Sequence, residues 1–347
     1  MKKTILVLIL LSFCQILLAQ SPREQRISSL EELETWFYYL GFNIPEKDYK
    51  AMLHSSYEMI VLEPVFTEIN NLDFPIAKFV TSLHDSKKDR LVIAYIDIGQ
   101  AEEWRSYWQN DWALGNPEWI VASDPDGWEG NFPVAYWHEE WQDIFLAKDG
   151  YLQKLIDAGF DGVYLDWIEA YSDEAVIAKA ELDGVDALEE MVKWVGNLGR
   201  YARAQSPEFL IIAQNAAELV DNKDYFKIID AIAQEQTWFD GSSDNNPAGD
   251  CPLPATDKDV NSVRYLFSLS SECKRVYLAY PESTLHVSSS SILVYLEQAR
   301  AQGLPIFTVD YALNEDNINE LYAKSHKLDF KPFASNRFLN IFVEPRN

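Results

Sequence analysis

Short and almost continuous runs of apolar residues recur along this chain, and helical patterns separate most of them. Runs that are apolar at nearly every position are typical of parallel strands covered on both faces. Their repeated alternation with helices predicts an α/β fold, a single-domain (β/α)8 TIM barrel. The predicted strands are 36–40, 59–63, 91–98, 163–166, 209–215, 231–235, 275–280 and 306–311.

Two of the intervening helices can be read from their spacing. Apolar residues between Leu188 and Leu198 recur every three or four positions, and the segment 289–300 has one apolar face and ends before Gly303. Residues 104–145 and 240–258 follow the third and sixth strands as long loops, which we expect to lie over the catalytic rim. The competing architecture is an open doubly wound sheet. It would call for a Gly-rich phosphate loop after an early strand, and the sequence contains none.

Composition narrows the class of protein. Apolar residues make up 48% of the chain, which favours a large core over disorder. The formal net charge of −26 argues against nucleic-acid binding, which depends on a basic surface. The acidic excess would suit a cationic ligand, but simple solubility is the better explanation of the charge taken alone. We expect a monomer.

The first residues predict export. Lys2 and Lys3 precede an apolar run from Ile5 to Leu11, and the segment from Gln15 to Ala19 follows and ends on a small residue. This order is typical of a secretory signal peptide, which predicts a leader at 1–20, a mature domain at 21–347 and a secreted or periplasmic protein. The alternative is an uncleaved anchor, but the apolar run is short for a bilayer. We expect no later segment to be an integral membrane span.

Two cysteines remain in the mature domain, Cys251 and Cys273. An even pair in an oxidising compartment favours a disulfide, which would staple a loop rich in Gly, Pro and Asp. The alternative is two buried free thiols.

Two acids stand out by their position at strand ends. Asp166 ends the fourth predicted strand and Glu235 ends the sixth. Both strands are even-numbered, so their side chains are expected to approach each other at the carboxyl-terminal mouth of a barrel. Paired carboxylates suit a glycosidase, with Asp166 as nucleophile and Glu235 as acid/base if the mechanism is retaining. The structural alternatives are a helix N-cap for Asp166 and a salt-bridged rim residue for Glu235.

Aromatic residues support sugar binding. Trp167 and Trp238 lie beside the two acids in sequence, and flat faces with a polar handle match the C–H faces and hydroxyls of a sugar ring. The many aromatic residues of 104–141 are better explained by packing beneath a long loop.

Other chemistries have little support. The five histidines are scattered and show no H-x-x-x-H spacing, so we expect no metal site and no cofactor. The sequence has no G-x-S-x-G elbow for a Ser nucleophile. A lyase or aldolase barrel would call for a Lys at a strand end, and none of the predicted strand ends carries one.

Several of these positions together resemble a known family. Residues 30–340 are similar to glycoside hydrolase family 114, the endo-α-1,4-polygalactosaminidase-like barrels, and the block from Gly159 to Asp166 is the most specific part. The other matching positions are Tyr95 to Gly99, Trp104, Arg105, Trp108, Trp119, Asp124-Pro125, Trp128, Gly130-Asn131, Val134, Tyr136-Trp137, Trp141, Gln214-Asn215, Glu235 and Asp310-Tyr311.

The resemblance implies hydrolysis of α-1,4 bonds in a galactosamine-containing polysaccharide, with Asp166 and Glu235 as the catalytic pair. A cationic amino-sugar polymer would be drawn to an acidic protein. The competing hypothesis is a cell-envelope barrel that binds glycan without cutting it. The residues expected to bind substrate are Glu63, Tyr95, Asp97, Tyr136, Trp167, Asn215, Trp238, Asp310 and Tyr311.

Overall fold

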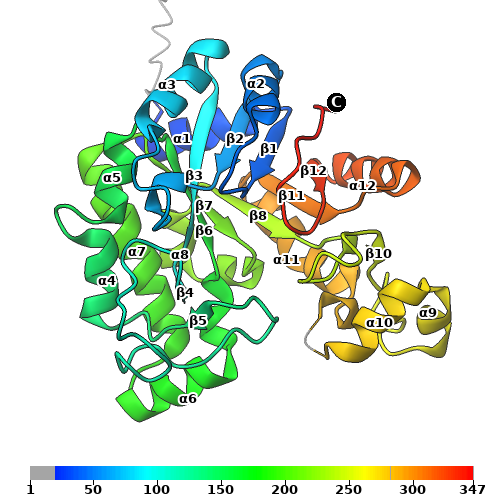
Figure 1. Cartoon of the computed structure of the whole chain (residues 1–347). Coiled ribbons are helices and arrows are strands. Elements are labelled where there is room, and N and C mark those ends of the chain that lie inside the picture. The colour runs from blue at the N-terminus through cyan, green and yellow to red at the C-terminus, as the bar shows by residue number, and fades with distance from the viewer. Residues whose placement is uncertain (1–19, 282, 347) are drawn as a thin grey trace, which may run out of the picture.

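A computed structural model describes residues 20–281 and 283–346, so the predicted leader lies outside the described residues. Eight parallel strands form one sheet that curls into a nearly closed barrel (Figure 1). This arrangement confirms the predicted (β/α)8 fold. In sheet order the strands are β1 (Trp36–Tyr39), β2 (Met59–Leu62), β3 (Leu91–Asp97), β6 (Gly162–Asp166), β7 (Leu210–Gln214), β8 (Ala231–Glu235), β11 (Ile306–Tyr311) and β12 (Lys331–Ser335).

Aromatic side chains fill the barrel interior and join its first and last strands. The Trp36 ring lies with its centroid 5.5 Å from both Phe307 and Phe333, and 6.5 Å from Tyr164. Its indole N–H donates to the carbonyl of Lys331 at 2.9 Å. Trp36 therefore connects β1, β6, β11 and β12 at the seam where β1 and β12 meet.

Helices follow most strands and cover the outside of the barrel (Figure 1). The predicted helices at Leu188–Leu198 and 289–300 are confirmed within α7 and α11. The main helices are α1 (Pro22–Glu31), α2 (Glu46–His54), α3 (Ile76–Ser86), α4 (Glu139–Leu146), α5 (Tyr151–Asp157), α6 (Glu174–Asp183), α7 (Ala187–Gln205), α8 (Lys223–Ile228), α11 (Ser289–Ala301) and α12 (Glu315–Lys327).

The predicted seventh strand at 275–280 is wrong. These residues belong to helix α10 (Ser271–Ala279), where Cys273 and Val276 are three positions apart and share the buried face. β11 is therefore the seventh strand and β12 the eighth. The sequence reading missed β12 because Lys331 and Pro332 interrupt its apolar pattern.

The loop after β8 carries a small helical unit beside the barrel mouth. It contains strands β9 (Phe239–Asp240) and β10 (Cys251–Pro252), helix α9 (Val263–Ser268), helix α10 and η4 (Thr284–His286). A disulfide joins Cys251 to Cys273, and both residues lie in a small apolar cluster separate from the main core. This unit forms one wall of the cavity described below.

The loop after β3 forms the opposite cover. Its strands β4 (Gln100–Glu102) and β5 (Asn131–Pro133) pair antiparallel. Trp119 packs between Trp112 and Trp141 at centroid distances of 4.9 and 5.4 Å. Trp119 and Trp141 are fully buried, so these two aromatic residues are packing elements, as the sequence reading expected.

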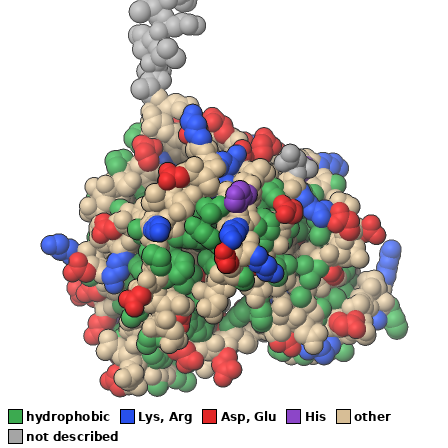
Figure 2. Space-filling model, turned by 45° about the horizontal axis from the view of Figure 1, so that its top comes forward, with side chains coloured by type: hydrophobic (Ala, Val, Ile, Leu, Met, Phe, Trp, Pro, Cys, Tyr) green, Lys and Arg blue, Asp and Glu red, His purple; other side chains and the backbone are tan. Residues whose placement is uncertain are grey.

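The protein surface mixes both signs of charge. Figure 2 shows acidic and basic side chains interspersed over one face of the molecule. In the part of the chain that the structure describes, none of the helices has the length and apolar character that crossing a membrane requires.

Candidate active site

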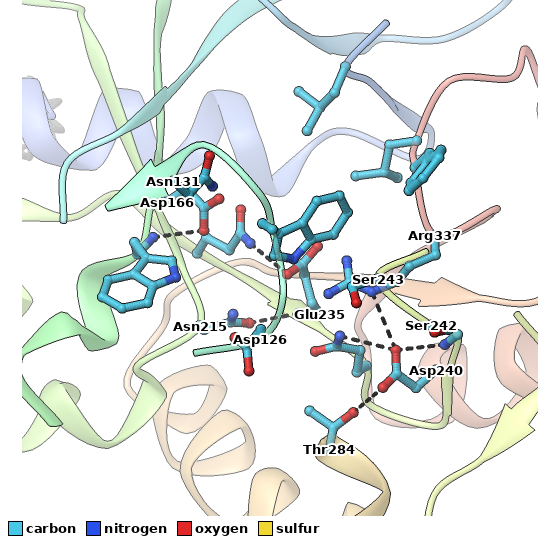
Figure 3. Close-up of a pocket in the computed structure, with 18 of the residues that line it drawn as sticks. Asp126, Asn131, Asp166, Asn215, Glu235, Asp240, Ser242, Ser243, Thr284 and Arg337 are labelled. Atoms are coloured by element: carbon cyan, nitrogen blue, oxygen red, sulfur yellow. Dashed lines mark hydrogen bonds and ion pairs between the residues drawn. The ribbon is translucent and has the colours of Figure 1, made fainter. Parts of the chain in front are cut away.

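A cavity of about 1130 Å³ opens at the carboxyl-terminal ends of the barrel strands. Asp166 at the end of β6 and Glu235 at the end of β8 both line it, and Figure 3 draws the two in the same pocket. The structure therefore brings these two acids together at one mouth of the barrel, as the sequence predicted. Aromatic side chains also line this cavity: Tyr38, Tyr39, Phe42, Tyr95, Trp104, Trp128, Trp167, Tyr280 and Phe338.

Asp166 is held by two donors on either side of its carboxylate. The Tyr95 hydroxyl donates to Oδ2 at 2.6 Å, and the backbone N–H of Trp167 donates to Oδ1 at 2.7 Å. Trp167 reaches this position because its φ of 57° turns the chain sharply after the strand. Burial and then the charge of Glu235 raise the pKa of Asp166 to about 7, while the two hydrogen bonds oppose that rise.

Glu235 is held by neutral donors. The Gln214 side chain donates to Oε2 at 2.7 Å, and the Tyr311 hydroxyl donates to Oε1. Arg337 donates to the same hydroxyl at 3.0 Å and stacks on the Tyr311 ring, with 4.4 Å from its guanidinium carbon to the ring centroid. The Tyr311 hydroxyl thus contacts both Glu235 and Arg337, a cation whose side chain is 15% exposed. Within the described residues, neither Asp166 nor Glu235 forms an ion pair.

Asn215 joins the two loops that carry the acids. Its side-chain oxygen accepts from the backbone N–H of Glu235 and from the Gln234 amide, both at 2.9 Å. Its side-chain nitrogen donates to Glu169 at 2.8 Å, in the turn after Asp166. The residue has a φ of 55°, a conformation that Asn tolerates better than most residues. Asn215, a predicted site residue, therefore lies between the carboxyl-terminal ends of β6 and β8.

Glu63 lines the cavity wall, but its carboxylate is already engaged. Arg105, 2% exposed, pairs with both oxygens of Glu63 and with both oxygens of Glu102, and also donates to Thr67 at 2.9 Å. The cluster ties the end of β2 to the loop after β3.

Five predicted site residues lie outside the cavity lining, and one of them, Tyr311, still reaches Glu235 through its hydroxyl. Trp238 packs against α12, where its indole donates to Ser325 Oγ at 3.1 Å. Asp310 is fully buried and accepts from the backbone N–H groups of Trp238 and Phe239. Tyr136 and Asp97 are also buried; Tyr136 donates to the Ala187 carbonyl, and Asp97 accepts from two N–H groups of its own turn. Asp310, Tyr136 and Asp97 thus bind backbone groups around the site, whereas Trp238 packs away from it.

Other lining residues were not anticipated. Glu169 lies three positions after Asp166, in η2 (Ile168–Ser172), and could have been noticed from that spacing. Arg337 comes from the loop after β12, a strand that the sequence reading missed, so no local signal pointed to it. In Figure 3 Arg337 points toward Asp240, and the two form an ion pair at 3.6 Å.

The described residues contain no group of three or more His, Cys, Asp or Glu side chains placed to hold a metal ion. The acids of the cavity are instead engaged by hydroxyls, amides and guanidinium groups, as described above.

Comparison with known proteins identifies the family. The profile of glycoside-hydrolase family GH114 matches residues 34–345. An uncharacterized protein of Deinococcus radiodurans is 41% identical over 274 residues, which is 78% of this chain and 78% of that protein.

Solved structures share the fold at low sequence identity. The glycoside hydrolase domain of PelA from Pseudomonas aeruginosa aligns with a TM-score of 0.58 and 15% identity, covering 89% of this chain and 97% of that one. Aspergillus fumigatus Ega3, solved in complex with galactosamine, aligns with a TM-score of 0.54 and 16% identity, covering 90% and 94%. The match of the family profile over nearly the whole chain, on a barrel with two acids at its mouth, shows that this protein belongs to glycoside hydrolase family GH114.

Proposed function

We propose that this protein hydrolyses α-1,4 bonds in a galactosamine-containing polysaccharide. The observation that carries the proposal is the pair Asp166 and Glu235, which line one cavity and form no ion pair with any residue that the structure describes. A glycan-binding barrel that does not cut its ligand has no need for two such carboxylates. The galactosamine bound to Ega3 supports an amino sugar as the substrate class to test first.

In the proposed retaining mechanism, the Asp166 carboxylate attacks the anomeric carbon as the bond to the leaving oxygen breaks. Glu235 gives its proton to that oxygen, and a covalent glycosyl-enzyme forms. Glu235, now ionised, then takes a proton from a water molecule. That water attacks the anomeric carbon and releases Asp166. Such a mechanism needs the carboxyl groups about 5 Å apart, and the raised pKa of Asp166, with Glu235 as its main charged cause, supports their proximity.

The surroundings of each acid support these roles. The hydrogen bonds from Tyr95 and Trp167 stabilise the ionised form of Asp166 that attack requires. Gln214 and Tyr311 hold the Glu235 carboxyl in a fixed orientation. Trp167 and Tyr95 offer aromatic surface beside the nucleophile for the apolar face of a sugar.

We also propose that the protein is exported and that its cysteine pair is oxidised there. The basic and apolar leader at 1–20 and the pairing of Cys251 with Cys273 support this location.

A polysaccharide screen tests the function. The purified protein is incubated with partly and fully deacetylated galactosamine polymers, with chitosan and with neutral galactans, and the products are analysed by mass spectrometry. We expect shorter oligosaccharides from the galactosamine polymers. Binding of these polymers without any new product would favour the non-catalytic barrel instead.

A further inference from the structure

Glu169 is a third carboxylate beside the catalytic pair, and one of its oxygens has no partner in the described part of the chain. Oε1 accepts from the side chain of Asn215 at 2.8 Å. Oε2 is buried and has no hydrogen-bond partner among the described residues. A buried acceptor without a donor costs free energy, and a ligand that supplies a donor would recover it. The residue lines the cavity, so a ligand in the cavity could provide that donor.

The charge of the cavity favours a cationic ligand. Eight carboxylates line it, whereas among the described residues the one cation that does so is Arg337. Burial and the charge of Asp166 raise the pKa of Glu169 to about 8.

The other carboxylates that line the cavity, outside the catalytic pair, already interact with neighbouring side chains. Glu63 and Glu102 are paired with Arg105. Asp240 pairs with Arg337 and accepts from Thr284, and Glu218 accepts from the Tyr171 hydroxyl. Asp126 interacts with Arg337 through its charge. Glu169 differs from these five because it combines a position near Asp166 with an acceptor oxygen that no described residue engages.

We propose that Glu169 binds the protonated amino group of a substrate sugar and selects free amines over N-acetylated sugars. The inference rests on the proposed function, because it assigns a substrate group to the same cavity. An ammonium group brings three donors and a positive charge to the free oxygen of Glu169. An acetamide brings one neutral donor and added bulk. Because the Asn215 side chain contacts both Glu169 and the backbone N–H of Glu235, the amine that Glu169 holds belongs to a sugar at or next to the attacked one.

Binding of monosaccharides tests this assignment without requiring catalysis. Galactosamine and galactose are titrated, with NMR detection, against the wild type and the variants Glu169→Gln and Glu218→Gln. Glu169→Gln keeps an oxygen that can accept from Asn215 but cannot ionise, so it lacks the negative charge that Glu169 gains beside an ammonium group. Glu218→Gln is the matched control, because it removes a cavity carboxylate that is engaged by a tyrosine. Thermal unfolding of each variant checks that the fold is retained.

We expect the wild type to prefer galactosamine over galactose. Glu169→Gln should weaken galactosamine binding by roughly ten- to a hundredfold and leave galactose binding unchanged, since a hydrogen bond to a charged group has about that effect. Glu218→Gln should bind both sugars as the wild type does. A wild type without a preference, or a Glu169→Gln variant that retains it or loses both sugars equally, overturns the proposal.

The outcome is separate from that of the hydrolysis proposal. If galactosamine binds through Glu169 but no polymer is cut, the hydrolysis proposal fails and the amine assignment stands. If polymers are cut and Glu169→Gln still prefers the amine, the amine assignment alone fails.

Discussion

Asp166 is expected to set the acidic limb of the pH–rate profile, because the proposed mechanism uses it as a carboxylate. Its pKa is raised to about 7 by burial and by Glu235. Glu235 must keep its proton for the same step, so kcat/KM should pass through a maximum. On the acid side it should fall about tenfold for each pH unit below about 7, to about 1% of that maximum at about pH 5. An ordinary aspartate would retain full activity there, since its pKa lies near about 3.9.

Replacing Tyr95 by Phe should move this limb upward. The Tyr95 hydroxyl donates to Asp166 at 2.6 Å and stabilises the ionised form. A hydrogen bond to a charged group contributes about 1.5–3 kcal/mol, which corresponds to about one to two pKa units. The midpoint should rise from about 7 to about 8–9, and activity at about pH 7 should fall from about half of the plateau to about 1–10%.

The assay is release of reducing ends at low substrate concentration, from about pH 5 to about pH 10, because kcat/KM reports the free enzyme. Tyr171→Phe is the control, since its hydroxyl donates to Glu218 rather than to Asp166. The limb that moves in Tyr95→Phe and not in Tyr171→Phe belongs to Asp166. A lower plateau with an unmoved midpoint, or a wild-type midpoint near about 4, would refute the reasoning.

Three further predictions concern stability. In urea unfolding, Asp166→Asn should stabilise the fold by about 0.5–2 kcal/mol above pH 7 and have little effect below about pH 4. The reason is that a carboxyl with a raised pKa destabilises the folded state once it ionises, so equal effects at both pH values would contradict this prediction. Arg105→Met should cost about 3–5 kcal/mol in the same assay, since it leaves two buried carboxylates unpaired, and a loss under about 1 kcal/mol would contradict this. Replacing both Cys251 and Cys273 by Ser should lower the free energy of unfolding by about 2–4 kcal/mol. Hydrogen exchange should rise first in the unit after β8 that forms the cavity wall, and unchanged amide protection in that unit would contradict the prediction.

Much of the barrel could be predicted because its strands are buried on both faces. The runs ending at Asp97, Asp166 and Glu235 are apolar at nearly every position, and the structure has strands there. The run 275–280 has the same composition but forms a helix, because its apolar positions pack in a small cluster around the disulfide. Composition alone does not distinguish a buried strand from a short helix.

The positions of side chains around the site follow less directly from the sequence than the positions of the strands. Trp238 lies three residues after Glu235, yet it points into a different cluster. Gln236 between them has a φ of 52°, which ends the alternation of the strand and redirects the chain. Arg337 and Glu169 depend on loops that meet only in the folded barrel. Strand ends can therefore be predicted from local pattern, while the residues that surround them require the fold.

The most direct test of the account is the kcat of Asp166→Asn and Glu235→Gln on the polymer that the wild type cuts. Each variant should be folded by circular dichroism and should lose roughly 10²-fold or more in kcat, because each removes a group that acts on the reacting bond. Substantial hydrolysis by both folded variants would contradict the claim that these two acids, brought together at the barrel mouth, carry the reaction.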